Sequence, residues 1–361
     1  MSWLGKKSHA FDSAPSGRLV TPGWLVARPA PPALPWPACP PCPDCCPGRP
    51  PAGPVRPGGR RQARPGGGKC AGRRPWPILL PVTTPRTLRL RQRDWPPGDY
   101  AVMAVINRTP DSFFDRGATF EFSAALRSVE RAVAAGADIV DIGGVKAGPG
   151  DEVDTAEEIR RVAGLVAAVR VRYPDLVIGV DTWRSEVAAA VADAGADLLN
   201  DVWGGVDQAF AHVAARRGIG LVCSHAGGLM PRTGPHRPGY DDVAADIISQ
   251  VTAEAGRAVA AGVDPDRILI DPAHDFGKTT WHSLEITRRL GEFISTGWPV
   301  LVAVSNKDFI GETLGLPPDQ RGEGTTAALA VSAWLGARVF RVHDVPAARR
   351  ALAAVASIRS G

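Results

Sequence analysis

The sequence predicts an α/β fold, a (β/α)8 barrel, which follows a long N-terminal tail. From residue 101 onward, short apolar segments typical of buried parallel strands alternate with Ala-rich segments whose apolar residues recur at helical spacing. A Gly-Ala-Asp or Gly-Ala-Arg tripeptide lies between a helical segment and a strand at 136–138, 195–197 and 336–338, where glycine supplies a left-handed turn. Repeated units of this kind form either an open doubly wound sheet or a closed barrel. Eight units in about 260 residues favour the barrel.

The eight expected strands are short and mostly apolar. We place them at 101–106, 139–142, 177–181, 198–201, 220–224, 268–271, 299–304 and 339–343. The clearest helical patterns between them lie at 156–171, 185–194, 241–261 and 324–335. A single folded domain is therefore predicted for residues 98–361.

Residues 1–97 differ in composition from the rest of the chain. They hold 22 of the 34 prolines and five of the six cysteines, and their 16 Lys/Arg against three Asp/Glu give a net charge of +13 ahead of a body of −8. Such a segment buries too little apolar surface to offset chain entropy, so we expect this Pro/Arg/Cys-rich tail to be disordered or not translated. The Cys-Pro-Pro-Cys run at 39–42 leaves a zinc site as an alternative, although prolines interrupt it and no histidine lies near.

The composition also bears on location and partners. No segment approaches the roughly 18 apolar residues of a membrane span, and the N-terminus lacks the apolar stretch of a secretion signal. The body contains one cysteine, Cys223, which fits a reducing cytoplasm. The basic tail has neither aromatic interleaving nor a folded nucleic-acid-binding motif. We therefore expect a cytoplasmic protein that binds a small molecule, and neither a membrane nor a nucleic acid.

Polar side chains occur where every predicted strand ends. In chain order they are Asn107, Asp141, Asp181, Asn200 with Asp201, His225, Asp271, Lys307, and Arg341 with His343. Individual Asp and Asn residues at such places can be helix caps. Packing alone does not explain eight polar strand ends, and catalytic side chains of (β/α)8 barrels lie at this end of the strands. The set therefore predicts a ligand site.

Four of these residues suit a flat heterocycle. Buried carboxylate and amide groups such as those of Asp181, Asn200 and Asp271 can pair with several N–H donors and acceptors along a ring edge. Lys307 can reach a ring carbonyl or nitrogen. A nitrogen-rich ring is the ligand that this combination predicts.

Three further residues suit a phosphorylated group. Arg341 and His343 share one strand end, and arginine offers a fork of donors to phosphate oxygens. The amide of Asn107 can join Mg²⁺ coordination that is shared with substrate phosphates and water. Mg²⁺ is therefore the expected cofactor, with Asn107 as its protein ligand.

The order of these motifs resembles a known family. Residues 103–115, Met-Ala-Val-Ile-Asn-Arg-Thr-Pro-Asp-Ser-Phe-Phe-Asp, resemble the first-loop signature of dihydropteroate synthases, which are pterin-binding barrels. Later motifs resemble further signatures of that family in the same order: Asp181-Thr-Trp, Asn200-Asp-Val, Asp271-Pro with Phe276-Gly-Lys, Ser305-Asn-Lys and Arg341-Val-His-Asp. The match spans roughly residues 101–357 and is most similar to the divergent second-copy type, in which the aminobenzoate loop is altered.

The resemblance implies roles for the matching residues. It implies that the pterin ring is held by Asp181, Asn200, Asp271 and Lys307. It implies that pyrophosphate and Mg²⁺ are handled by Asn107, Arg341 and His343, which with Lys307 would form the catalytic group. In the family reaction, pyrophosphate leaves a pterin methyl group with help from Mg²⁺ and cations, and the amine of p-aminobenzoate captures the resulting cation. A homodimer is also implied, and the Ala-rich segments 324–335 and 345–357 would suit its interface.

Two motifs depart from the family pattern on the second-substrate side. The family loop Gly-Gly-Glu-Ser-Thr-Arg-Pro-Gly reads Gly-Gly-Val-Lys-Ala-Gly-Pro-Gly at 143–150, so Ala147 and Gly148 replace a hydroxyl and a cation. Lys146 is expected to leave this loop in another direction. The family motif Ser-Arg-Lys-Ser has become Ser-Asn-Lys-Asp at 305–308, so that Asn306 replaces a cation and Asp308 stands where the aminobenzoate carboxylate docks. Two like charges about 4 Å apart repel by about 4 kcal/mol at an effective dielectric constant near 20.

Two functions are compatible with this pattern. The first is a dihydropteroate synthase-like transferase that condenses 6-hydroxymethyl-7,8-dihydropterin pyrophosphate with p-aminobenzoate in folate biosynthesis. The alternative is a divergent paralogue that binds a pterin or pterin-like phosphate without synthase activity, with a different second substrate or none. A pterin-binding methyltransferase module would need a partner domain, for which the chain leaves no room outside the tail, and a non-catalytic scaffold would not explain the polar strand ends.

Overall fold

The computed structural model describes residues 85–109, 121–232 and 239–360. All described residues belong to one unit of the chain, residues 73–361. The predicted disorder of residues 1–84 and the cysteine run at 39–42 therefore concern residues outside the described part.

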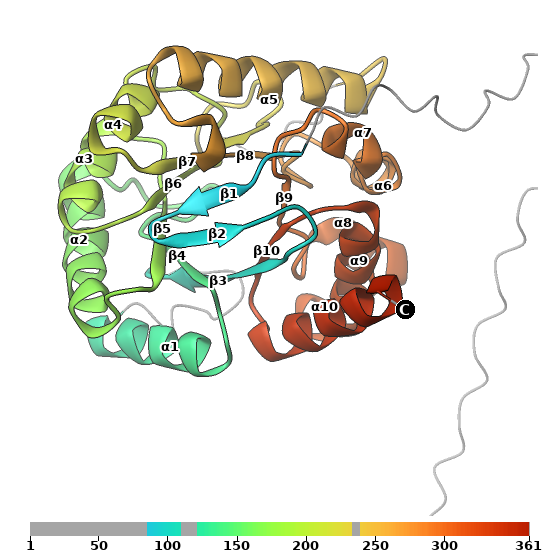
Figure 1. Ribbon diagram of the computed structural model, residues 1–361, viewed down its shortest axis with the longest axis horizontal. Coiled ribbons are helices and arrows are strands. Elements are labelled where there is room, and N and C mark those ends of the chain that lie inside the picture. Colours follow the sequence, from blue (N-terminus) through green and yellow to red (C-terminus); the bar gives the residue numbers. More distant parts are fainter. Residues whose placement is uncertain (1–84, 110–120, 233–238, 361) are drawn as a thin grey trace, which may run out of the picture. The chain divides into compact units, whose positions relative to one another are not determined.

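Eight parallel strands form a barrel, as the sequence predicts (Figure 1). They are β3 (Ala101–Asn107), β4 (Ile139–Gly143), β5 (Val177–Asp181), β6 (Leu198–Asp201), β7 (Gly220–Ser224), β8 (Ile268–Asp271), β9 (Leu301–Val302) and β10 (Val339–Val342). Their order in the sheet is β8-β7-β6-β5-β4-β3-β10-β9. A parallel bridge between Ile270 and Val300 joins the two outer strands, with the Ile270 amide donating to Pro299 O at 3.0 Å. The (β/α)8 prediction is confirmed.

Helices surround the barrel on its outer side (Figure 1). They are α1 (Phe122–Ala134), α2 (Thr155–Arg172), α3 (Ser185–Asp193), α4 (Phe210–Arg217), α5 (Val243–Ala260), α6 (Thr280–Arg288), α7 (Leu290–Ile294), α8 (Asp308–Leu314), α9 (Gly322–Leu335) and α10 (Val345–Ser360). Short 3-10 turns occupy Pro265–Arg267 and Pro318–Gln320. In the described part of the chain, no helix is both long and apolar enough to cross a membrane.

The repeated tripeptide performs the turn predicted for it. Gly136, Gly195 and Gly336 follow the ends of α1, α3 and α9 with φ values of 91°, 107° and 112°, which lie in the left-handed region that glycine adopts without strain. The third residue of the tripeptide then ties the strands together. Asp138 Oδ2 accepts from the Val102 amide and Asp197 Oδ2 accepts from the Ile178 amide, both at 2.9 Å.

A β-hairpin closes the amino-terminal end of the barrel. Its strands, β1 (Leu88–Leu90) and β2 (Arg93–Trp95), are antiparallel and lie across that end in Figure 1. Leu88 and Leu90 are fully buried and Trp95 is 5% exposed, in one cluster with inward residues such as Met103. The hairpin, which precedes the predicted boundary between residues 97 and 98, thus packs against the barrel. The alternation of apolar and polar residues at 88–95 is strand-like, but the composition of the whole 97-residue segment conceals it.

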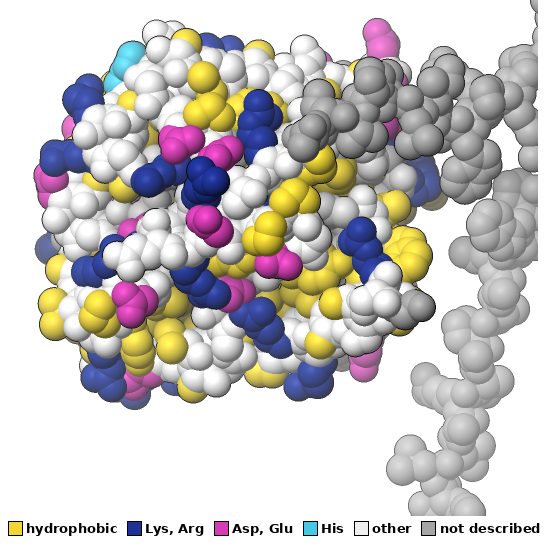
Figure 2. Space-filling view, viewed as in Figure 1, with side chains coloured by type: hydrophobic (Ala, Val, Ile, Leu, Met, Phe, Trp, Pro, Cys, Tyr) yellow, Lys and Arg dark blue, Asp and Glu magenta, His cyan; other side chains and the backbone are white. Residues whose placement is uncertain are grey.

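Ion pairs surround the hairpin at this end. Arg93 pairs with Asp138 at 2.8 Å, Arg91 pairs with Asp197 at 3.2 Å, and Arg338 donates to Pro96 O at 2.8 Å. These three partners are the third residues of the repeated tripeptide, so the same residues begin the strands and hold the hairpin. Figure 2 shows side chains of both charges over this face.

Candidate functional site

The inward-facing side chains of the barrel form layers, because residues alternate between the two faces of each strand. The layer next to the hairpin is apolar and includes Met103, Ile139, Val177, Leu198 and Val222. Two residues further along, five of the eight strands carry a polar residue, and these five form the polar layer: Asp141, Asn200, Ser224, Asp271 and Arg341. The interior therefore changes from apolar to polar within one step along the strands.

The carboxyl ends of the strands surround a cavity of about 420 Å³. Eight residues predicted from the sequence line it: Asn107, Ala147, Gly148, Asp181, Lys307, Asp308, Arg341 and His343. Asn200 and Asp271 belong to the polar layer and are only 1% and 4% exposed. Asn306 is not among the residues that line the cavity. Eight predicted site residues thus line one cavity, whereas Asn200, Asp271 and Asn306 are buried and are not among its lining residues.

Arg341 reaches from β10 across the barrel interior to β4 and β5. Its Nε donates to Asp141 Oδ2 at 2.7 Å and its Nη2 donates to Asp181 Oδ2 at 2.9 Å. Asp141 Oδ2 also accepts from Asn200 Nδ2 at 2.9 Å. The guanidinium predicted to face phosphate is thus held, in this structure, between two carboxylates on the predicted ring side.

The buried carboxyl groups titrate in an unusual range. Burial raises the pKa of Asp181 to about 7, although the Arg341 guanidinium opposes this shift. Burial also raises the pKa of Asp271, against the effect of Lys307. A carboxyl group donates a hydrogen bond when protonated and only accepts when ionised. Near neutral pH, Asp181 can therefore meet either a donor or an acceptor on a ligand ring.

Lys307 and Phe276 form one wall of the cavity. The Lys307 Nζ donates to His274 O at 2.5 Å and lies 5.1 Å from the centroid of the Phe276 ring. Burial lowers the pKa of Lys307. An aromatic face beside a cation provides a surface against which a flat ring can stack.

The residues predicted to bind phosphate lie on the neighbouring strands β3 and β10. His343 Nδ1 is 2.9 Å from Ser305 Oγ, which also accepts from the His343 amide at 3.2 Å, so Ser305 fixes the imidazole. Asn107 ends β3 and lines the same cavity as His343. Among the described residues, no group of three His, Cys, Asp or Glu side chains could hold a metal ion. The single amide oxygen of Asn107 beside the predicted phosphate position fits Mg²⁺, because this ion commonly takes one or two protein oxygens and fills its other positions with phosphate and water.

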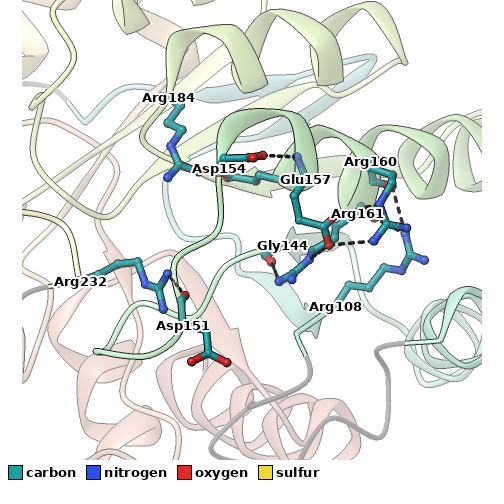
Figure 3. A network of polar contacts seen from close by, with 10 residues as sticks. Arg108, Gly144, Asp151, Asp154, Glu157, Arg160, Arg161, Arg184 and Arg232 are labelled. Carbon is teal, nitrogen blue, oxygen red and sulfur yellow. Dashed lines mark hydrogen bonds and ion pairs between the residues drawn. The ribbon is translucent and has the colours of Figure 1, made fainter.

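The loop between β4 and α2 is held by arginines from other elements (Figure 3). Arg161 Nη1 donates to Gly144 O at 2.9 Å, Arg184 Nη2 donates to Val153 O at 2.7 Å, and Arg232 Nη1 donates to Asp151 O at 2.5 Å. Arg108, which follows Asn107 in the chain, donates to Arg161 O at 2.5 Å. These contacts fix the backbone of the loop, and the cations that make them do not line the cavity.

Lys146 lies on the cavity side of this loop, contrary to the expectation that its side chain leaves in another direction. It lines the cavity together with Ala147 and Gly148. A Cβ atom added at Gly148 would lie 3.7 Å from Lys146 Cε. The Lys146 side chain therefore borders the space beside Gly148. It places a positive charge near the position where the family arginine is missing.

Asp308 is paired with a cation that the sequence motif did not reveal. Its Oδ1 accepts from Arg321 Nη1 at 2.8 Å, and the same nitrogen donates to Asn306 O at 2.9 Å. The Asn306 side chain accepts from Thr325 Oγ1 at 3.2 Å, with a backbone φ of 56°. The Asn306 side chain, predicted to belong to the altered site, is bonded to α9 and is not among the residues that line the cavity. The charge of Asp308 is partly compensated by Arg321.

A family model described as pterin binding enzyme matches residues 103–343. The chain belongs to the pterin-binding enzyme family. The inactive dihydropteroate synthase 2 of Mycobacterium tuberculosis is 57% identical over 267 residues, which cover 73% of this chain and 84% of that protein. The dihydropteroate synthase of Haemophilus influenzae is 36% identical over 247 residues, which cover 68% of this chain and 89% of that protein.

Solved structures of pterin-binding enzymes have the same fold. The Yersinia pestis dihydropteroate synthase, in a sulfonamide drug complex, aligns with a TM-score of 0.72 at 34% identity, over 76% of this chain and 100% of that chain. The resemblance that the motifs predict is therefore confirmed, and it extends to a divergent second copy of dihydropteroate synthase.

Asp275 and Ser305 are among the polar residues of this pterin-binding barrel that line the cavity and were not predicted to do so. Asp275 lines the cavity, and its carboxylate accepts from Ser283 Oγ at 3.0 Å. It has a φ of 70° in the loop after β8, where a residue other than glycine is unusual. Ser305 lines the cavity and holds His343. Ser305 belongs to the same motif as Lys307, and this could have revealed it.

Two polar strand ends of the pterin-binding barrel have structural roles instead of lining the cavity. Asp201 accepts from the Trp203 amide at 3.0 Å and from the Gly205 amide at 2.7 Å, which fixes a turn. Lys278 Nζ lies 3.0 Å from His225 Nδ1 and donates a hydrogen bond to His225 O, also at 3.0 Å. Burial lowers the pKa of Lys278 to about 7.

Proposed function

We propose that this chain binds a pterin pyrophosphate at the carboxyl end of the barrel and does not efficiently condense it with p-aminobenzoate. The contrast between the two sides of the cavity carries this proposal. Of the predicted ring residues, Asn200 and Asp271 are buried in the polar layer, and Asp181 and Lys307 line the cavity. On the second-substrate side, Ala147, Gly148 and Asp308 line the cavity in place of the hydroxyl, arginine and serine of the family pattern. Similarity to proteins named inactive dihydropteroate synthase 2 supports the same conclusion.

The proposed roles divide the site into ring and phosphate parts. Asp181, Asn200 and Asp271 accept from or donate to the edge of the pterin ring, and Lys307 contacts a ring carbonyl or nitrogen. Arg341 belongs to both parts, since it borders the cavity while it is bonded to Asp181.

The phosphate part is formed by Asn107 and His343 together with Arg341. When Mg²⁺ is bound, it supplies positive charge that stabilises a departing pyrophosphate, and Asn107 is its proposed protein ligand. His343, held by Ser305, and Arg341 donate hydrogen bonds to phosphate oxygens. These groups position the phosphates and stabilise their charge, so no nucleophilic side chain is required.

A synthase with weak aminobenzoate binding is the second candidate function. The ion pair between Asp308 and Arg321 favours it, because the pair reduces the repulsion that a carboxylate would meet. Lys146 favours it as well, because it places a positive charge on the cavity wall beside Gly148.

Calorimetry and product analysis separate these two functions. The full chain is titrated with 6-hydroxymethyl-7,8-dihydropterin pyrophosphate and Mg²⁺, and then with p-aminobenzoate, while pteroate formation is measured chromatographically. The proposal predicts micromolar binding of the pterin pyrophosphate, weak binding of p-aminobenzoate and little pteroate. Robust turnover at micromolar p-aminobenzoate would establish the synthase function, and no binding of the pterin pyrophosphate would refute both.

The chain is also proposed to form a homodimer through α9 and α10. Val331 and Trp334 on α9 are 50% and 55% exposed, and Ile358 on α10 is 67% exposed. Large apolar side chains at the surface are typical of protein interfaces. Light scattering on the full chain would report a dimeric mass, and Trp334→Glu would shift it toward the monomer.

A further inference from the structure

Ser224 has a buried hydroxyl group for which the proposed roles leave no function. It is the last residue of β7 and is 3% exposed. Its Oγ has no hydrogen-bond partner among the residues that the structure describes. Leaving a buried polar group unsatisfied is unfavourable, so such a group in a barrel interior needs an explanation.

The pattern along β7 shows which way this side chain faces. Val222 belongs to the apolar cluster inside the barrel, whereas Leu221 and Cys223 belong to the cluster between the sheet and the helices. Because side chains alternate along a strand, Ser224 faces inward like Val222. Its backbone carbonyl borders the next loop, at 2.8 Å from the position of a Cβ on Gly204.

The strand register places Ser224 beside residues proposed to bind the ring. Ser224 is paired with Asp271 on β8, and Val222 is paired with Asn200 on β6. Asn200 also faces inward, since Leu198 lies in the inner cluster and Leu199 in the outer one. On β7, Ser224 therefore stands between two strands that each contribute a proposed ring-binding side chain.

Two further polar atoms in the same layer lack partners. Asp141 Oδ1 and Asn200 Oδ1 are buried and have no hydrogen-bond partner within the described part of the chain. The Asp141 carboxylate and the Asn200 amide are joined through their other atoms at 2.9 Å. Two acceptors and one hydroxyl, which can donate or accept, thus remain for a ligand with N–H groups along one edge.

We propose that Ser224 is an additional ring-binding residue that hydrogen-bonds the polar edge of the heterocycle between Asn200 and Asp271. This inference rests on the proposed pterin-binding function and adds one specificity-determining contact to it. The contact selects a ring that presents a third polar atom toward β7. A hydrocarbon or halogenated edge at this point would leave the Ser224 hydroxyl without a partner, and such a ring would bind more weakly.

The test compares Ser224→Ala with the wild type in the full-length chain. The two probes are 6-hydroxymethylpterin, which has the ring without phosphates, and inorganic pyrophosphate with Mg²⁺, which has the phosphates without the ring. We expect Ser224→Ala to weaken pterin binding by three- to tenfold and to leave pyrophosphate binding unchanged. Ser332→Ala is the matched control, because Ser332 is also fully buried but its hydroxyl is bonded to Ala328 O within α9.

Each outcome is decisive. If the wild type binds the pterin and Ser224→Ala binds it equally well, the Ser224 contact is refuted and the proposed function stands. If the wild type binds 6-hydroxymethyl-7,8-dihydropterin pyrophosphate but not the bare pterin, the ring contact of Ser224 is refuted, and if it binds neither, the proposed function itself is refuted. Equal weakening of both probes by Ser224→Ala would show a general disturbance of the site and would also overturn the contact.

Discussion

The two ends of the barrel differ in what their side chains contribute. At the amino-terminal end, Leu88, Leu90 and Trp95 of the hairpin fill the barrel with apolar groups, and ion pairs surround them. At the carboxyl end, the interior holds carboxylates with raised pKa values, a buried arginine and polar atoms without partners. In (β/α)8 barrels the first end serves stability and the second serves function. Here the change occurs between consecutive inward layers, and each end can be perturbed separately.

Removal of the hairpin is expected to have the largest effect. Trp95→Ala should lower the free energy of unfolding by about 3–5 kcal/mol, because it leaves a cavity between the hairpin and the amino-terminal end of the barrel. This corresponds to a fall in melting temperature of roughly 6–20 °C for a domain of this size. A chain that begins at Pro85 should melt like the full chain, whereas one that begins at Tyr100 should be severely destabilised.

Differential scanning calorimetry checks this expectation, and Trp281→Ala is its control. Trp281 is 77% exposed on α6, so its truncation should change the melting temperature little. Equal stability of the chains that begin at residues 85 and 100 would show that the hairpin does not stabilise the barrel.

Acid is expected to weaken ring binding by an intermediate amount. Asp181 has a pKa near 7, raised mainly by burial, with Arg341 on β10 opposing the shift and Asp141 on β4, Glu158 on α2 and Asp201 on β6 adding to it. If the ionised carboxylate accepts from ring N–H groups, affinity for 6-hydroxymethylpterin is full above pH 7. It should fall by up to about tenfold for each pH unit below 7, as the carboxylate becomes protonated.

Titrations between pH 5.5 and 7.5 measure this slope in the wild type and in Asp181→Asn. The amide has nearly the same shape but does not titrate, so its affinity should be lower and independent of pH. A slope in the variant equal to that of the wild type would assign the pH dependence to another group, such as Lys278, whose pKa is also about 7.

Relief of the charge at Asp308 is expected to have the smallest effect. The Asp308 side chain is 76% exposed and is paired with Arg321, so water and the guanidinium reduce its field. Asp308→Ser should therefore improve p-aminobenzoate binding only a few-fold, on the scale of an exposed ion pair of about 1 kcal/mol or less. Asp308→Asn, which keeps the size of the side chain, is the matched variant. An improvement of a hundredfold in calorimetry would mean that Arg321 does not compensate the charge.

The barrel was predictable because each of its strands can be recognised from the residues of that strand alone. The strand segments are continuously apolar, and the predicted limits agree closely with the observed ones for β5, β6, β7 and β8. The glycine of the repeated tripeptide was predicted to supply a left-handed turn, and its φ is positive at all three positions. The hairpin at 88–95 was not predicted, because its burial depends on residues from all around the barrel.

The positions of several cavity-lining residues could be predicted from the sequence, whereas their hydrogen-bond partners could not. The positions of Asn107, Asp181 and His343 follow from where strands end. The partner of Asp308 comes from a residue 13 positions later in the chain, and the direction of Lys146 depends on the loop backbone. Neither could be read from the motif alone, because both depend on which side chains the folded chain places next to each other.

The ion pairs of Arg341 link the proposed ring and phosphate parts of the site. One positive charge serves both Asp141 and Asp181, and the same side chain borders the cavity where phosphates are proposed to bind. A phosphate that draws Arg341 toward itself removes a counter-ion from Asp181 and favours the protonated form of that carboxyl group. The arrival of the phosphates and the uptake of a proton at the ring side would then be one linked event, so the barrel would distinguish a phosphorylated ring from a bare one by its protonation as well as by its affinity.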